Sequence, residues 1–279
     1  SEYNSLNGFV ASITPFNFTA IGGNLASAPL LFGNSVIWKP SQHAILSNHL
    51  FYEIMIEAGL PEGVLNFCPM EAEPFFEGVS SRNDLGALLF TGSSTVFDKM
   101  NKEIYATIES RSVYPKVVGE TGGKNFHFID EISIENGHTI TNVSQKTVES
   151  AFNYSGQKCS ACSIAYVPEN MLEIFVERIK QFTKFYNDNM ENYGVISEES
   201  YNRITEIWDE ISNDPEIEVI EDIGNCDKES YFISPKIVIC RDHENRVFNE
   251  EFFAPILAIY PYDSSDPNER YNMMELCCE

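Results

Sequence analysis

The sequence predicts an α/β fold, in which a largely parallel sheet is covered by helices. The chain has 279 residues, of which 43% are hydrophobic, so it can bury a sizeable core and has room for two domains. Along its first half, short apolar runs of strand length alternate with stretches of helical periodicity. Strands that alternate with helices indicate a parallel sheet with helices on both faces.

The first half carries turn signals at the ends of its predicted elements. Pro15 and Pro40 each follow an apolar run, and Ser41 is placed to cap a helix that Gly59 ends. In chain order we expect strands at residues 9–13, 35–39, 64–67, 85–90 and 116–118, with helices at 21–32, after Ser41 and after Ser94.

The second half is less regular, and its pattern is typical of α+β. Apolar residues at helical spacing from Ile140 to Phe152 predict a helix that stops at Gly156, and a strand follows at 164–167. Aromatic stripes predict helices at 171–186 and 198–212, and we interpret both stripes as core. Strands are expected at 216–220 and 231–239, and an acidic turn at 250–255 leads into another.

Charge and composition restrict the class of function. The formal net charge of −24 argues against nucleic acid and anionic membranes as partners, because both bind basic surfaces. No apolar run is long enough to cross a bilayer. Seven cysteines without regular spacing indicate reduced thiols in a reducing compartment. The chain begins at Ser1 and stops at Glu279 without a finishing element, so we expect it to lack both ends of a longer protein.

Cys159 is the first candidate for chemistry. It follows a predicted helix end and precedes a strand, where backbone N–H groups are available to face an anion. Such a position lowers a thiol pKa from about 8.5 toward neutrality. A small core cysteine is the alternative, and Cys162 completes a C-x-x-C that would suit a redox pair or half of a zinc site. No second C-x-x-C or histidine pair follows at ligand spacing, which disfavours zinc.

Further candidates follow predicted strands, because parallel sheets bind ligands beyond the carboxyl ends of their strands. Lys39 ends the second strand, where its ammonium group could meet a ribose hydroxyl. Gly92 and Ser93 begin a helix whose N–H groups and dipole suit a pyrophosphate. An ordinary solvated lysine and an ordinary N-cap explain these residues equally well. Glu120, beside two glycines, is placed for a general base, although a surface turn is the better explanation from this segment alone.

The chain carries a series of motifs in the order Pro15-Phe16-Asn17-Phe18, Lys39-Pro40-Ser41, Phe90-Thr91-Gly92-Ser93, Glu120-Thr121-Gly122-Gly123-Lys124, Gly156-Gln157-Lys158-Cys159 and Glu250-Glu251-Phe252-Phe253-Ala254-Pro255. In order and spacing, over essentially the whole chain, this series resembles the aldehyde dehydrogenase superfamily. The longer strings from Phe16 to Asn24, Gly122 to Phe128 and Gly156 to Ser163 are most similar to its branch that oxidises L-glutamate γ-semialdehyde.

The resemblance implies a fold, a cofactor and a substrate. It implies a Rossmann-type NAD-binding domain at residues 1–122 and an α/β catalytic domain at 123–279, both incomplete. NAD is the implied cofactor, no metal is implied, and the substrate is a small-molecule aldehyde. The implied reaction converts L-glutamate γ-semialdehyde, formed from 1-pyrroline-5-carboxylate, to L-glutamate in proline breakdown. We also expect a homo-oligomer for the complete protein, in the mitochondrial matrix of a eukaryote or otherwise in the cytoplasm.

The resemblance also assigns chemical roles. Cys159 would be the nucleophile, adding to the aldehyde carbon to give a thiohemiacetal and then a thioester. Asn17 would hold the developing oxyanion together with the Cys159 backbone N–H. Glu120 would activate the water that hydrolyses the thioester.

Binding roles follow in the same way. Lys39 and Glu251 would bind the two ribose groups of NAD, Gly92 and Ser93 would lie near the pyrophosphate, and Phe253 near the nicotinamide. Ser160 and Phe18 match positions that line the substrate pocket, with Ser160 toward the substrate carboxylate.

One departure and two alternatives accompany these expectations. Ala254 stands where the family usually has glycine, which adds a methyl group at a point of close backbone approach. The chain could be a catalytically inactive fragment or a degenerate relative. It could also be an aldehyde dehydrogenase with another substrate.

Overall fold

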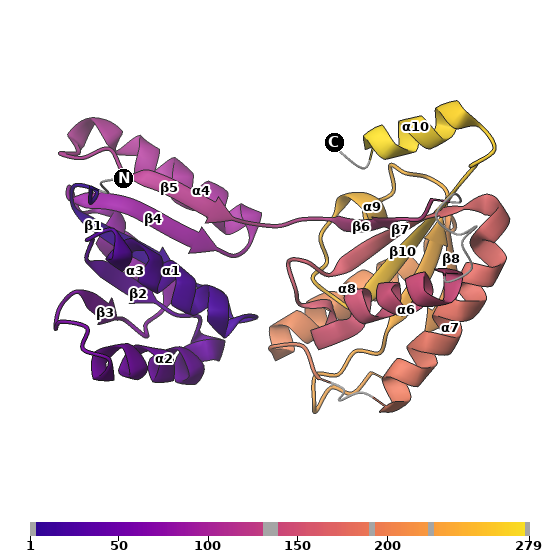
Figure 1. Cartoon of the computed structure of the whole chain (residues 1–279), viewed down its shortest axis with the longest axis horizontal. Helices are drawn as coiled ribbons and strands as arrows, with labels where there is room; N and C mark the ends of the chain where they lie inside the picture. Colours follow the sequence, from indigo (N-terminus) through magenta and orange to yellow (C-terminus); the bar gives the residue numbers. More distant parts are fainter. Residues whose placement is uncertain (1–3, 131–138, 190–192, 223–225, 277–279) are drawn as a thin grey trace. The chain divides into compact units, whose positions relative to one another are not determined.

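The computed structural model describes residues 4–130, 139–189, 193–222 and 226–276. The chain divides into two compact units, Ser1–Gly122 and Gly123–Glu279, and each contains one five-stranded sheet (Figure 1). The α/β fold predicted from the sequence is confirmed. Within the described ranges, none of the helices has the length and apolar character that a membrane span requires.

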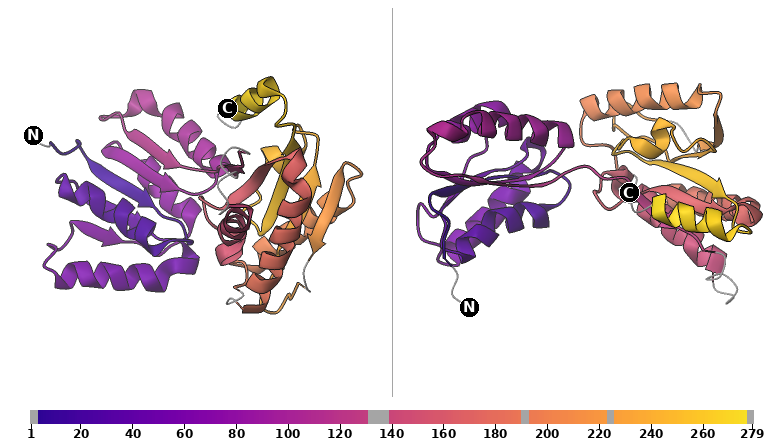
Figure 2. Two further views of the ribbon diagram at one scale, coloured as in Figure 1. Left: turned by 45° about the vertical axis from the view of Figure 1, so that its right-hand side comes forward. Right: turned by 90° about the horizontal axis from the view of Figure 1, so that it is seen from above.

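The sheet of the first unit is parallel throughout, in the strand order β3-β2-β1-β4-β5. Helices cover both of its faces, as the view from above in Figure 2 shows. In chain order its elements are β1 (Phe9–Ile13), α1 (Thr19–Leu31), β2 (Val36–Lys39), η1 (Gln42–Ala44), α2 (Ile45–Glu57), β3 (Leu65–Phe67), α3 (Ala72–Ser80), β4 (Leu85–Thr91), α4 (Ser94–Ala106), η2 (Ile108–Ser110) and β5 (Lys116–Glu120).

Alternate residues of these strands enter two separate cores, because neighbouring side chains of a strand point to opposite faces. On one face Val10 and Trp38 pack with Ala26 of α1. On the other face Ala11 packs in a cluster with residues of α3 and α4, among them Ile104. This burial on both faces explains why the strands read as continuous apolar runs in the sequence.

The strand order places a topological switch point between β1 and β4. The chain continues from β1 to β2 and β3 on one side, and β4 and β5 lie on the other. Ile13 and Phe90 are partners in the ladder, so the carboxyl ends of the two strands are adjacent. Open α/β sheets bind their ligands at such a point.

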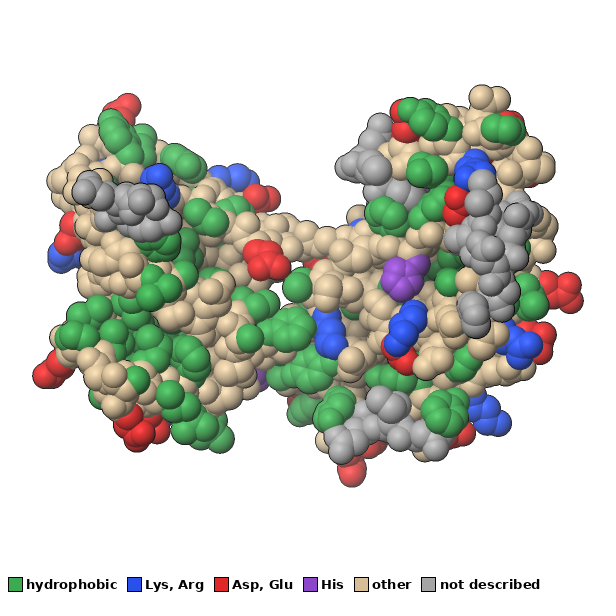
Figure 3. Space-filling view, in the orientation of Figure 1, with side chains coloured by type: hydrophobic (Ala, Val, Ile, Leu, Met, Phe, Trp, Pro, Cys, Tyr) green, Lys and Arg blue, Asp and Glu red, His purple; other side chains and the backbone are tan. Residues whose placement is uncertain are grey.

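Helix α2 turns an apolar stripe to solvent within the first unit. Leu46, Leu50 and Ile54 are 86%, 58% and 54% exposed, and Figure 3 shows hydrophobic side chains at the surface over this region. Their spacing places them on one face of the helix. The core-facing side chains of the same helix include Phe51 and Tyr52.

The second unit contains a mixed sheet in the order β6-β7-β10-β9-β8, in which only β8 runs antiparallel to its neighbour among the described strands. Apolar clusters pack α6 and α7 on one face and α8 on the other. Its elements are β6 (Asn125–Phe128), α6 (Thr139–Phe152), η3 (Asn153–Gly156), β7 (Cys162–Pro168), η4 (Glu169–Met171), α7 (Leu172–Asn189), α8 (Glu198–Ser212), β8 (Ile217–Asp222), β9 (Lys236–Cys240), α9 (Arg246–Asn249), β10 (Ile256–Tyr262) and α10 (Pro267–Leu276).

Several expectations for local structure were wrong. The α+β pattern expected for the second half is instead a mainly parallel sheet whose strands alternate with helices. The strand expected at 231–239 begins only at Lys236, because Tyr231 has φ of 55° and Phe232 pairs with Asp227. Helix α3 was not expected, and Pro74 and Gly78 within it explain why its pattern is weak.

Two helix ends also differ from the prediction. Ser41 precedes the short turn η1 and makes no side-chain cap, so α2 begins only at Ile45. Helix α6 ends at Phe152 rather than at Gly156. The residues between them form a distorted turn that shapes the loop carrying Cys159.

Candidate active site

The loop that carries Cys159 begins with a left-handed turn. Tyr154, Ser155 and Gly156 have φ of 58°, 55° and 69°, a conformation that costs about 1–3 kcal/mol at each non-glycine residue. A Cβ on Gly156 would lie 2.3 Å from the carbonyl oxygen of Ala254. Glycine is therefore required at this position both by its φ angle and by the approach of the 250–255 turn.

Gln157 ties the start of this loop to a distant segment. Its side chain is 2% exposed, and its Oε1 accepts a hydrogen bond from the Ile196 N–H at 2.8 Å. Its Nε2 donates to the Tyr154 carbonyl at 3.2 Å. Because the amide is buried and bonded at both ends, the residues before Cys159 are held in one conformation.

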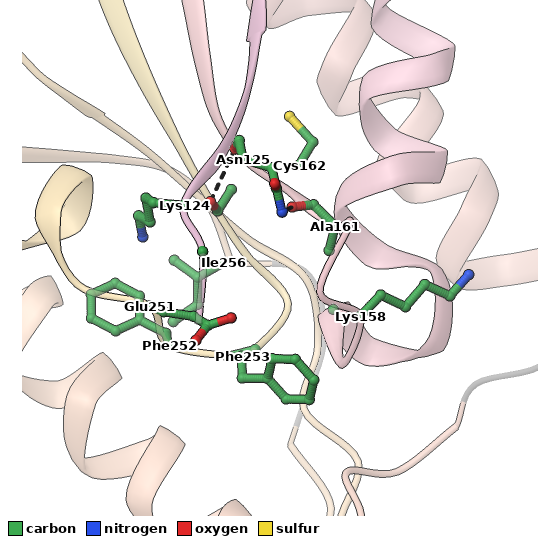
Figure 4. Close-up of a pocket in the computed structure, with 13 residues that line it drawn as sticks. Lys124, Asn125, Lys158, Ala161, Cys162, Glu251, Phe252, Phe253 and Ile256 are labelled. Carbon is green, nitrogen blue, oxygen red and sulfur yellow. Dashed lines mark hydrogen bonds between the residues drawn. The ribbon is translucent and has the colours of Figure 1, made fainter. Parts of the chain in front are cut away.

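Asn125, the first residue of β6, holds the other side of the loop. Its Nδ2 donates to the carbonyl oxygens of Cys159 and of Ala161, the latter at 3.2 Å. Its own carbonyl accepts from Ser163 Oγ at 3.1 Å. Figure 4 shows its amide directed toward Ala161. The backbone of the candidate nucleophile is thus fixed by a side chain from the neighbouring strand.

The two cysteines of the C-x-x-C segment have different environments. Cys159 is half-buried in the loop, whereas Cys162 begins β7 and is 2% exposed. The Cys162 thiol donates to the Ile164 carbonyl at 3.2 Å, and burial raises its pKa to about 12. Cys162 is therefore a core thiol that stays protonated at neutral pH. Among the described residues, no group of three or more His, Cys, Asp and Glu side chains could hold a metal ion.

Glu251 and Phe253 lie in the turn between α9 and β10. Phe253 has φ of 52°, which is unusual for an aromatic residue and is a form of strain typical of functional sites. Burial raises the pKa of Glu251, whereas a hydrogen bond from the Gly123 N–H and the charges of Lys124 and Arg203 lower it. The turn thus presents a carboxylate and an aromatic ring side by side (Figure 4).

Lys124 braces this turn. Its Nζ donates to the Glu250 carbonyl at 2.7 Å and lies 4.4 Å from the centre of the Phe252 ring. Burial lowers the pKa of Lys124 to about 8, although Glu251 and Glu250 oppose the shift. A compact cation between carbonyl, ring and carboxylate holds the turn against the start of β6.

The Cys159 loop and the Glu251 turn line one pocket of the second unit. The loop contributes Lys158 and Ala161, and the turn contributes Glu251 and Phe253 (Figure 4). Ser160, expected to face the substrate carboxylate, is exposed in the same loop.

The predicted residues of the first unit follow its strands. Gly92 donates its N–H to the Glu120 carbonyl at 3.2 Å, and Thr91 is the ladder partner of Glu120. Ser93 caps α4 by accepting from the Val96 N–H at 3.4 Å. The structure therefore brings Gly92, Ser93 and exposed Glu120 together at the ends of β4 and β5.

The remaining predicted residues of this unit lie at the ends of β1 and β2. Lys39 ends β2 and is 6% exposed. Burial lowers its pKa, whereas Glu71 raises it, so the expected alternative of a solvated lysine does not hold. Asn17 and Phe18 are half-buried between β1 and α1. They belong to the first unit, whereas Cys159 belongs to the second.

A comparison with known protein families identifies the family of this chain. Residues 3–272 match the model of the aldehyde dehydrogenase family. The chain belongs to the aldehyde dehydrogenase family. The resemblance seen in the ordered motifs of the sequence is thereby confirmed.

Two curated relatives with similar sequences carry the same name. The chain is 41% identical to the mitochondrial delta-1-pyrroline-5-carboxylate dehydrogenase of Emericella nidulans, over 94% of this chain and 46% of that protein. It is 38% identical to the human mitochondrial protein of the same name, over 96% of this chain and 47% of the relative. The chain thus spans about half the length of the curated relatives it matches.

A solved structure gives the same result. The delta-pyrroline-5-carboxylate dehydrogenase of Mycobacterium tuberculosis, determined with bound NAD, superposes with a TM-score of 0.86 at 27% identity. The match covers 99% of this chain and 50% of that structure. The fold described above is therefore the aldehyde dehydrogenase fold over the length of the chain.

Three residues with clear structural roles were missed by sequence reasoning. Lys124, Asn125 and Gln157 were seen only as letters of the family motifs and were given no role. Their position beside glycines in those motifs was the available signal. Their bonding partners lie far away in the sequence, so the signal could not say what they hold.

Proposed function

We propose that this chain carries the cofactor and nucleophile elements of an NAD-dependent dehydrogenase. The substrate is L-glutamate γ-semialdehyde, the open form of 1-pyrroline-5-carboxylate, and the product is L-glutamate. The observation that carries the proposal is the loop of Cys159, which the side-chain amides of Asn125 and Gln157 hold on both sides. The names of the relatives at 41% and 38% identity support the choice of substrate.

The first unit fits a dinucleotide at its switch point. A Cβ on Gly92 would lie 2.5 Å from the Phe90 ring. Glycine fits this position, and it leaves the backbone without a side chain of its own where helix α4 begins. The N-terminus of α4 offers N–H groups and a positive dipole end to a pyrophosphate. Lys39 brings a cation to the end of β2, suited to ribose hydroxyls. We assign residues 1–122 as the NAD-binding domain and 123–279 as the catalytic domain, with Glu251 for the second ribose and Phe253 beside the nicotinamide.

Different residues of the chain then carry out successive steps of the proposed reaction. The Cys159 thiolate forms a C–S bond to the aldehyde carbon, and Asn17 and the Cys159 N–H donate to the oxygen that becomes negative. One such donor is worth about 10²–10³ in rate. NAD, when bound, supplies the oxidant that takes up the hydride from the substrate carbon. Glu120 removes a proton from the water that attacks the resulting thioester, which breaks the C–S bond and releases the acid.

The proposal extends to the substrate and the cellular setting. Ser160 and Phe18 line the substrate pocket, with Ser160 toward the substrate carboxylate. The relatives are named as mitochondrial, so in a eukaryote we place the protein in the mitochondrial matrix, and otherwise in the cytoplasm. We also propose that the complete protein is a homo-oligomer, and the net charge of −24 on residues 1–279 disfavours nucleic acid and anionic membranes as partners.

Brief alkylation with iodoacetamide, followed by mass mapping, tests the nucleophile. Cys159 should be modified before Cys226, a half-buried thiol with no proposed role, and well before the core thiol Cys162. In the complete reading frame, Cys159→Ser should abolish NADH formation from 1-pyrroline-5-carboxylate, while Cys226→Ser leaves it intact. Faster modification of Cys226, or turnover by Cys159→Ser, would contradict the proposal.

A non-catalytic role is a second candidate, favoured by the length of the chain. Because it spans about half of its relatives, residues 1–279 expressed alone are expected to form no NADH. An absorbance assay on this chain beside the complete reading frame separates the two. Activity in both would exclude the non-catalytic role, and activity in neither would exclude the enzyme.

A further inference from the structure

One amide group bridges two carbonyl oxygens of the loop that carries the nucleophile. The Nδ2 of Asn125 has two hydrogens, and it donates to the carbonyls of Cys159 and Ala161. A backbone bond from the Ala161 N–H to the Lys158 carbonyl, at 3.1 Å, closes the turn between them. The backbone from Lys158 to Ala161 thus forms a closed turn, and Asn125 bonds to two of its carbonyl groups.

This contact sets the direction of the peptide that follows the nucleophile. A peptide bond is planar and trans, so its carbonyl and its N–H point in opposite directions. With the Cys159 carbonyl turned to Asn125, the Ser160 N–H is turned the other way. The ψ angle of Cys159, and with it the direction of its side chain relative to the loop, is fixed by a residue outside the loop.

Asn125 itself cannot move independently of the sheet. It lies opposite Cys162 in the ladder of β6 and β7, and its carbonyl accepts from Ser163. Its neighbour Lys124 is bonded to the Glu250 carbonyl on the other side of the pocket. The brace is therefore anchored in rigid structure, as a group that orients a reacting side chain should be.

We infer that Asn125 is the positioning residue of the Cys159 nucleophile, which it acts on through the Cys159 and Ala161 carbonyls. The inference rests on the proposed function only in taking Cys159 as the reacting thiol. In this role Asn125 acts through the loop backbone, because its amide is used in the bonds to the two carbonyls. Its effect is to keep the backbone at Cys159, and with it the thiol, in one orientation, so that the surroundings that set the stability of the thiolate stay fixed.

The first unit supplies a matched control. Asn34 uses its Nδ2 in the same way, donating to the carbonyls of Leu6 and Gly8 at 2.9 and 3.2 Å. Asn34→Ala therefore removes an equivalent amide bridge from a loop that has no part in the proposed chemistry. A loss of stability common to both variants can be separated from an effect on Cys159 alone.

The experiment measures the pH profile of iodoacetamide alkylation at Cys159 by mass mapping, with thermal unfolding recorded for each variant. In Asn125→Ala the midpoint of the profile should move to higher pH by about one unit relative to the wild type. Asn34→Ala should keep the wild-type midpoint. Asn125→Ser keeps one donor on a smaller side chain, so its midpoint should lie between those of the wild type and Asn125→Ala. This variant still tests the inference if Asn125→Ala does not fold.

The outcomes separate the inference from the proposed function. Equal midpoints in the wild type and in the folded Asn125 variants would overturn the inference alone. An equal shift in Asn34→Ala would also overturn it, since the effect would then be a general loss of stability. A wild-type Cys159 that reacts no faster than Cys226 would instead contradict the proposed function.

Discussion

The two units build their candidate sites by different means. In the first unit, Gly92, Ser93 and Glu120 come together because β4 and β5 are adjacent and parallel, and their bonds to one another are mostly between backbone groups. In the second unit, the Cys159 loop is held by two side-chain amides: Asn125 bonds to it from β6, and Gln157 of the loop accepts from the distant Ile196 N–H. The first site follows from topology, and the second depends on individual side chains.

This difference predicts how each site responds to substitution. A site formed by strand ends should keep its geometry when one side chain is changed, so that only the chemistry of that group is lost. A loop held by side chains should lose its geometry when one of them is removed. The following variants test that contrast, beginning with the largest expected effect.

Glu120→Gln should separate the two halves of the reaction in the complete enzyme. The amide cannot accept a proton from water, so turnover should fall by about 10²–10⁴. Because Glu120 is held by the ladder with β4, thioester formation should persist, and rapid mixing should show an NADH burst before slow turnover. Glu109→Gln, an exposed carboxylate of the same unit, is the control. Loss of the burst would show that Glu120 acts before hydride transfer.

Gly156→Ala should be the most destabilising change in the Cys159 loop. The new Cβ would meet the Ala254 carbonyl at 2.3 Å and also force alanine to a φ of 69°. We expect a loss of about 2–3 kcal/mol in the free energy of unfolding, measured in urea. Gly59→Ala isolates the cost of the dihedral angle, because Gly59 has φ of 97° and no atom within 4 Å of its Cβ position. An equal loss in both variants would exclude the contact with Ala254 as the cause.

The contrast also explains what the sequence could and could not predict. Lys39, Gly92, Ser93 and Glu120 follow apolar runs, so the α/β pattern alone locates them at strand ends. The partners of Gln157 and Asn125 depend on which backbone N–H and carbonyl groups the folded chain brings near them. The conformation of residues 153–156 was missed for the same reason: Tyr154 and Ser155 adopt left-handed angles that no local preference favours.

The pH dependence of stability tests whether Lys124 is buried against the Glu251 turn. Its pKa is lowered from 10.5 to about 8, so between pH 8 and 10.5 the unfolded chain binds more protons at this residue than the folded one. Stability contributed by Lys124 should therefore rise with pH across that window. The difference in urea midpoint between Lys124→Met and the wild type should shift in favour of the wild type from pH 7 to pH 10.

Lys39→Met is the comparison from the first unit, where burial also lowers the lysine pKa and Glu71 opposes it. The same rise with pH is expected there. A Lys124→Met variant whose difference from the wild type does not change between pH 7 and pH 10 would show that Lys124 is not desolvated in the folded protein.

Ser93→Ala should have the smallest effect on stability and a specific effect on nucleotide binding. The Ser93 cap is an exposed bond of 3.4 Å, and its loss should cost about 0.5–1 kcal/mol. Ser197, which caps α8 by accepting from the Ser200 N–H at 3.2 Å, provides a matched cap in the second unit. Both alanine variants should therefore lose similar stability. Only Ser93→Ala should weaken NAD binding, measured by calorimetry on the complete reading frame, because a loosened first turn of α4 presents its N–H groups to the pyrophosphate less well. Equal NAD affinity in the two variants would remove Ser93 from the cofactor site and leave it an ordinary helix cap.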